Sequence, residues 1–215
     1  MCRLPLHGII KKYQTNVDAK GEWKLSLQTP VAGGPYSITF SDGEDLTLQN
    51  ILIGEVWFCS GQSNMEMPVK RVPRTTGLMG SQPYIVSANP KRPLRLYTVK
   101  NNWSTTLKEE GIDGQWSEAS SEEVADFSAT AYYFATSLSR ALRIPVGIIS
   151  SAYGGATVEG WISRELLENY PDISPQPRFH RTPAPHAPPH ADVQCHAEAA
   201  SELYHKGIHL VSRRV

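Results

Sequence analysis

The sequence lacks several features that would point to whole classes of function. No apolar run approaches the roughly 20 residues that a helix needs to cross a bilayer. Charge is balanced at 21 basic and 21 acidic side chains, so no attraction to nucleic acid or to a membrane surface is predicted. The three cysteines, Cys2, Cys59 and Cys195, have no metal-ligand spacing. The first ten residues are too short and too interrupted for a secretion signal.

Residues 1–50 have the pattern of a β-domain. The stretch GEWKLSLQT alternates Trp23, Leu25 and Leu27 with polar residues, which is the period of a half-buried strand. A Gly-Gly-Pro turn, a strand over residues 36–40, the turn SDGED and another strand follow. Because three short strands do not readily form a stable sheet, we expect these residues to be part of a β-sandwich domain whose beginning is absent.

Residues 51–172 have a different, α/β pattern. Three apolar runs, EVWFC, PLRLYTV and IPVGIISSAYGG, predict strands of a parallel sheet, the first of them covered on both faces. The stretch 128–143 predicts a helix with Ser128 as its N-cap. The residues at helical spacing, which we expect to form its apolar face, are Tyr133, Phe134, Ser137, Leu138, Ala141 and Leu142. A helix followed by a buried strand is typical of βαβ units.

Two of the predicted strands end in small polar residues, in CSGQSN and in SSAYGGATVEGW. Ligands bind at the carboxyl ends of parallel strands. A nucleophilic serine needs a sharp turn and a backbone N–H beside it for the oxyanion, and Gly61 before Ser63 permits such a turn. The G-x-S-x-G pattern is absent. These residues alone leave two interpretations open, a catalytic Ser63 and an ordinary loop serine.

The block GQSNMEMP after an apolar strand, and GIISSAYGGATVEGW about ninety residues later, resemble the sialate O-acetylesterase family. The resemblance covers roughly residues 15–172 and includes DAKGEWKLSLQTPVAGGPYSI in the β part. It implies a serine esterase of the SGNH-hydrolase type, which has a flavodoxin-like parallel sheet with helices on both faces and needs no metal or cofactor.

The resemblance also implies roles for single residues. Ser63 matches the nucleophile, and the N–H groups of Ser63 and of Gly155, with Gly154 beside it, match the oxyanion hole. The residues that the resemblance places around the substrate are Gln62, Asn64, Glu159 and Trp161. Gln62 and Asn64 equally fit a role in stabilising the turn, whereas for Trp161 packing under the loop is the favoured interpretation. Met65, Met67 and Cys59 are interpreted as core fillers, and Glu122 and Asp126 as solvated carboxylates.

The family's WYQGE block and its late acid and histidine do not appear in this sequence. Residues 173–215 are rich in Pro and His, without a strand pattern, and predict an irregular tail. Some codon choices for HKGIHLVSRRV encode WYQGE when they are translated in the frame shifted by one base. Some codon choices for HADVQCH, translated in the same shifted frame, encode a second stretch that resembles the family. We therefore expect a chain that leaves its frame near residues 173–182 and ends early. Such a chain would expose an apolar edge, be poorly stable and be weakly active or inactive.

The expected function is removal of O-acetyl groups from sialic acids through an acetyl-enzyme. One alternative is the same chemistry on acetylated xylan or another glycan. A second is a non-catalytic carbohydrate-binding module, whose sugar platforms would be Trp23, Trp57, Trp103, Trp116 and Trp161. Trp23 and Trp57 lie in strand patterns, which favours their burial. The resemblance implies an extracytoplasmic location, periplasmic, secreted or lysosomal. No feature of the sequence indicates an oligomeric state.

Overall fold

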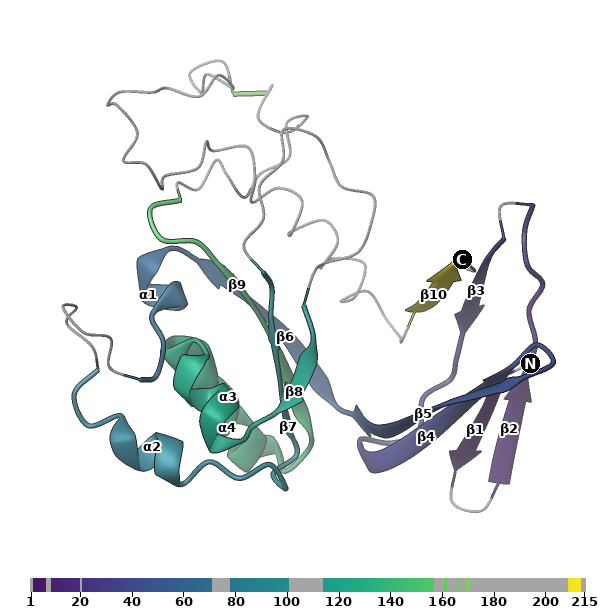
Figure 1. Cartoon of the computed structure of the whole chain (residues 1–215), viewed down its shortest axis with the longest axis horizontal. Helices are drawn as coiled ribbons and strands as arrows, with labels where there is room; N and C mark the ends of the chain where they lie inside the picture. The colour runs from purple at the N-terminus through teal and green to yellow at the C-terminus, as the bar shows by residue number, and fades with distance from the viewer. Residues whose placement is uncertain are drawn as a thin grey trace.

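The computed structural model describes residues 2–6, 9–19, 21–70, 78–100, 114–156, 161, 166, 169–170 and 209–213. Two bodies of structure are visible in Figure 1, an all-β part and an α/β part, joined where strand β5 runs into strand β6. None of the helices in the described ranges combines the length and the apolar character needed to cross a membrane.

The β part consists of two sets of antiparallel strands. Strands β1 (Cys2–Leu6), β2 (Ile9–Tyr13), β4 (Gly33–Ser41) and β5 (Asp45–Ile53) form one sheet in the order β2-β1-β4-β5. Strand β3 (Glu22–Ser26) pairs with β10 (His209–Arg213). Buried Leu27 and Ile38 form a small core, with Leu25 and Phe40 packed against it. The three strands predicted between residues 22 and 53 are confirmed, and Trp23 is half-buried against Phe40.

Strand β10 differs from the prediction of an irregular tail. His209 to Arg213 pair residue by residue with Ser26 to Glu22, so this short segment adopts regular β structure. The pairing consists of backbone hydrogen bonds along two strands, and a two-stranded ribbon is marginally stable in water by itself. The remaining histidines assigned to the tail, His180, His186, His190, His196 and His205, lie outside the described residues.

The α/β part is built on a four-stranded sheet. Its strands are β6 (Glu55–Gly61), β7 (Leu94–Thr98), β8 (Trp116–Glu118) and β9 (Val146–Ala152), in the order β6-β9-β7-β8. Strand β9 is parallel to both β6 and β7, and β8 is antiparallel to β7. The predicted α/β class with a parallel sheet is confirmed. The third parallel strand lies between the first two, whereas in the flavodoxin-like order the first strand lies between the second and the third.

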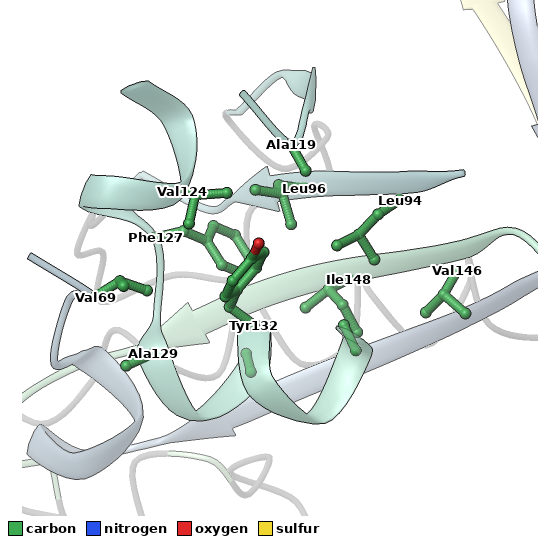
Figure 2. Close-up of a cluster of buried hydrophobic side chains, with 12 residues drawn as sticks. Val69, Leu94, Leu96, Ala119, Val124, Phe127, Ala129, Tyr132, Val146 and Ile148 are labelled. Atoms are coloured by element: carbon green, nitrogen blue, oxygen red, sulfur yellow. The ribbon is translucent and has the colours of Figure 1, made fainter. Parts of the chain in front are cut away.

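Four helices accompany this sheet: α1 (Ser63–Glu66), α2 (Gln82–Val86), α3 (Ser121–Asp126) and α4 (Ala129–Leu142). Helix α4 begins as predicted, because the Ser128 side chain accepts a hydrogen bond from the N–H of Ala131 at 3.3 Å. All four helices contribute side chains to one cluster on one face of the sheet. Figure 2 shows Tyr132 and Phe127 in the middle of that cluster, beside Leu96 and Ile148 of the sheet. Within the described residues, no helix packs on the other face.

Two details of burial differ from the prediction. The buried face of α4 consists of Ala129, Ala131, Tyr132, Ala135 and Thr136. Small side chains on this face let the helix approach β9 closely, while Phe134 is 39% exposed and packs edge-on against Trp57.

Strand β6 is not buried on both faces as predicted, because every one of its residues is exposed or half-buried. It is the edge strand of the described sheet, and its Val56 and Trp57 are 38% and 37% exposed. The most buried strand is β9, which lies between β6 and β7.

Candidate active site

Residues 61–66, which carry the predicted nucleophile Ser63 and are called the nucleophile turn below, lie at the carboxyl end of β6. Gly61, the last residue of the strand, has φ of +147°, a value that side chains strongly disfavour. Gln62 follows as the N-cap of α1, and its carbonyl oxygen accepts hydrogen bonds from the N–H groups of Met65 at 2.8 Å and Glu66 at 3.0 Å. Ser63 is thus the first residue of a single helical turn, and its side chain is exposed.

Contacts with the hydrophobic core and with helix α4 hold the turn in place. Met65 is half-buried and packs against the core, which confirms its interpretation as a core filler. The hydroxyl of Thr130 on α4 donates to the carbonyl oxygen of Asn64 at 3.0 Å. The side chain of Asn64 is exposed. The backbone around Ser63 is therefore fixed by contacts with both the core and α4.

The immediate partner of Ser63 is the side chain of Gln62. Gln62 Oε1 accepts a hydrogen bond from Ser63 Oγ at 3.1 Å and from the N–H of Ser63 at 3.3 Å. The role of Gln62 in stabilising the turn is therefore visible directly. Both groups that the resemblance assigns to chemistry, the hydroxyl and the N–H of Ser63, are engaged by this one oxygen. In the part of the chain that the structure describes, Ser63 Oγ is bonded to no histidine.

The glycine loop lies beside the nucleophile turn because β6 and β9 are parallel neighbours. Gly61 is in register with Ala152, so both strands end at the same edge of the sheet. The N–H of Tyr153 donates to the carbonyl oxygen of Gly61 at 3.0 Å. A Cβ built on Gly154 would lie 3.9 Å from the Cα of Ser63. The two blocks, ninety residues apart in sequence, thus meet as expected for strand ends in a parallel sheet.

The two glycines of this loop are in different situations. The N–H of Gly154 donates to Oε2 of Glu66 at 2.8 Å, so it is already used. Gly155 has φ of +85°, and a Cβ built on it would meet no atom within 4 Å. Its N–H donates to no residue that the structure describes. Gly155 is therefore the better-placed of the two as a free N–H donor.

The structure describes the other predicted site residues only in part. Trp161 is half-buried, and Glu159 lies outside the described residues. Asp126 forms an ion pair with Lys70, and both side chains are exposed. Sequence reasoning passed over Glu66. Its position three residues after Ser63 was a usable signal, because residues three apart in a helix lie on neighbouring parts of its surface.

Cys59 on β6 is the other potentially nucleophilic group near the turn. It is half-buried against the core, and burial raises the pKa of its thiol above the ordinary value. A protonated thiol is a poor nucleophile, so Cys59 acts as a core residue, as predicted. Among the residues that the structure describes, no three His, Cys, Asp or Glu side chains gather as metal ligands would.

Comparison with known proteins agrees with the two sequence motifs. No family model matches the chain. The sialate O-acetylesterases of Pongo abelii and Homo sapiens are each 29% identical to it over 172 residues, which cover 74% of this chain and 32% of each relative. A solved carbohydrate acetylesterase from Xanthomonas citri superposes with a TM-score of 0.66 at 30% identity, covering 78% of this chain and 37% of that protein. The chain spans about a third of the length of the curated relatives it matches.

Proposed function

We propose that this chain, a member of the sialate O-acetylesterase family, carries the nucleophile and part of the oxyanion hole of a carbohydrate acetylesterase. The observation that carries the proposal is the position of Ser63. It is exposed at a strand end, on a turn that the glycine at position 61 permits, beside a loop in which the N–H of Gly155 bonds to none of the residues that the structure describes. A serine on an ordinary loop needs neither a glycine-dependent turn nor a neighbouring N–H donor.

In the proposed reaction, Ser63 Oγ attacks the carbonyl carbon of an acetyl ester. The carbonyl oxygen becomes an oxyanion, which the N–H groups of Ser63 and Gly155 stabilise after Gln62 Oε1 has moved aside. The C–O bond to the sugar then breaks, and the sugar alkoxide takes up the proton that Ser63 released and leaves as an alcohol. The remaining acetyl-serine is hydrolysed by water to acetate, which restores the Ser63 hydroxyl.

The hydroxyl of Ser63 needs a base to accept its proton, since a serine without one is a poor nucleophile. The described residues bring no histidine to it. We therefore propose that this 215-residue chain has weak turnover or none, and that acylation by strongly activated reagents is the step that it retains.

The proposed substrate is an O-acetylated sialic acid, since the curated relatives are named for that activity. Acetylated xylan or another acetylated glycan is the alternative, because the Xanthomonas citri neighbour is named only as a carbohydrate acetylesterase. Release of acetate from acetylated sialic acid and from acetylated xylan, compared at equal ester concentration, separates the two. An extracytoplasmic location belongs to the same proposal.

The test of the nucleophile is covalent labelling of the full chain with a fluorophosphonate, followed by peptide mapping. We expect labelling at Ser63 in the wild type and its loss in Ser63→Ala. Ser60→Ala is the matched control, since Ser60 lies three residues earlier, on β6, and its substitution should leave the labelling unchanged. Equal labelling of the wild type and of Ser63→Ala would refute the role of Ser63.

The carbohydrate-binding module remains a second candidate because of one exposed aromatic residue. Trp116 is 43% exposed, packs edge-on against Tyr97 and lies over Gly147 of the sheet. A flat indole at the surface is a common platform for a sugar ring, although such a ring also serves as ordinary strand packing. Glycan binding that persists in Ser63→Ala and disappears in Trp116→Ala, together with an absence of labelling, would favour the module.

A further inference from the structure

Glu66 connects the two halves of the candidate active site. It is the last residue of α1, the helical turn that begins with Ser63. Its Oε2 accepts the N–H of Gly154 at 2.8 Å, across 88 residues of sequence. This hydrogen bond joins the side chain of one block directly to the backbone of the other. A second hydrogen bond, from the N–H of Tyr153 to the carbonyl oxygen of Gly61, joins the same two strand ends.

The fit between Glu66 and Gly154 is tight. A Cβ built on Gly154 would lie 2.5 Å from Glu66 Oε2, which is closer than real side chains approach. A side chain at Gly154, whose φ is not in the left-handed region, would make the flexible Glu66 carboxylate shift, and that shift would disturb its hydrogen bond with the N–H of Gly154. Gly155 has φ of +85°, which favours glycine for a different reason. The two glycines of the loop thus meet different constraints.

The same hydrogen bond occupies the first N–H of the loop. Because the carboxylate holds the N–H of Gly154, it restrains the peptide unit that precedes Gly154 and limits how far the N–H of Gly155 can move relative to Ser63. A loop without this anchor would have to order itself during the reaction, which slows a step that depends on preorganised donors.

We propose that Glu66 is a positioning residue, whose carboxylate anchors the Gly154–Gly155 loop so that Gly155 presents its N–H to an oxyanion at Ser63. The catalytic part of this inference rests on the proposed function. The anchoring part does not, because it concerns only the contact between Glu66 and Gly154. Glu66→Gln keeps an acceptor oxygen at the same reach, and Glu66→Ala removes it.

The anchor is tested by amide hydrogen exchange of the full chain, read by NMR with ¹⁵N labelling. In Glu66→Ala we expect the amide of Gly154 to exchange about tenfold faster, as loss of a hydrogen bond to a charged acceptor implies. In Glu66→Gln the increase should be roughly threefold or less. Glu122→Ala is the matched control, because Glu122 is an exposed glutamate in the short helix α3. An unchanged Gly154 amide in a folded Glu66→Ala variant would overturn the proposal.

The catalytic consequence is tested by the rate of fluorophosphonate labelling at Ser63. We expect Glu66→Ala to label about tenfold more slowly, with Glu66→Gln and Glu122→Ala near the wild-type rate. Faster exchange at Gly154 with an unchanged labelling rate would overturn the positioning role. Faster exchange in a protein whose wild type does not label would support the anchor and refute the nucleophile, so the two failures are distinguishable.

Discussion

Replacing Gly61 with alanine is expected to destabilise the fold and to displace the nucleophile turn. A Cβ at this position would lie 2.8 Å from Cγ of Met65 and 3.3 Å from its Cβ. A side chain at a strained positive φ costs about 1 to 2 kcal/mol, and overpacking against a half-buried neighbour adds about 1 to 3 kcal/mol. Because methionine adapts readily, we expect a total loss of roughly 2 to 3 kcal/mol in the free energy of unfolding.

Gly43 provides the matched control for this substitution. It has φ of +130°, close to that of Gly61, but a Cβ there would meet no atom within 4 Å. Gly43→Ala should therefore show only the backbone cost of about 1 to 2 kcal/mol. The double variant Gly61→Ala with Met65→Ala, compared with both single variants, isolates the contact between the two side chains.

The measurement is urea unfolding of the full chain followed by tryptophan fluorescence, with the labelling rate of Ser63 as a second readout. We expect Gly61→Ala to slow the labelling and Gly43→Ala to leave it unchanged, since Gly43 lies in the turn between β4 and β5. Equal losses at the two glycines would refute the contact with Met65. No loss at Gly61 would refute the strained turn itself, and with it the argument that the sequence is shaped around Ser63.

Three further predictions concern stability and reactivity. Thr136 Oγ1 is buried without a hydrogen-bond partner among the described residues, so Thr136→Val should stabilise the chain by about 1 kcal/mol; a lower melting temperature would contradict this. The Asn50 side chain forms hydrogen bonds with Arg95 and Glu118 at 2.8 Å each, and its φ is +59°. Glycine tolerates that backbone conformation, so Asn50→Gly should lower the free energy of unfolding by about 1 kcal/mol through loss of these hydrogen bonds alone. An unchanged urea midpoint would show that this link between β5 and the α/β sheet is weak. Burial raises the pKa of the Cys59 thiol, so its alkylation should be slower in the folded chain than in urea. The stability that comes from the protonated thiol should be lost as the pH rises through the pKa of the folded state. Equal alkylation rates in the folded and the unfolded chain would contradict the burial of Cys59.

Several elements could be predicted because their signals are local. The N-cap at Ser128 predicts the start of α4, and the apolar run around Pro145 predicts β9; each pattern is contained in a few consecutive residues. The positive φ of Gly61 followed from the need for a sharp turn after a strand. The meeting of the Ser63 and Gly154 blocks followed from a general property of parallel sheets, whose strand ends share one edge.

The remaining features depend on which segments become neighbours. Tyr132 and Ala135 face the core rather than Phe134 and Leu142 because packing against β9 and the other helices fixes which side of α4 is buried, and helical spacing alone does not specify that side. The pairing of β10 with β3 joins segments almost the whole chain apart, and no periodicity within HLVSR specifies that partner. Glu66 is the same kind of case, since its partner is a backbone N–H that composition does not reveal.

The geometry of the candidate site depends on very little of the sheet. Ser63 follows β6 and Gly155 follows β9, and these strands pair along seven consecutive residues from Glu55 and Val146 to Gly61 and Ala152. Their relative position is therefore fixed by one ladder of hydrogen bonds, one bond from Tyr153 to Gly61 and the carboxylate of Glu66. The chain matches about a third of the length of its curated relatives, and both motifs meet within that part. The N–H groups proposed for the oxyanion hole depend on two strands alone, whereas the group that would accept the Ser63 proton is a separate structural requirement. We therefore predict that phosphonylation of Ser63 by a fluorophosphonate survives even where turnover of an acetyl ester does not.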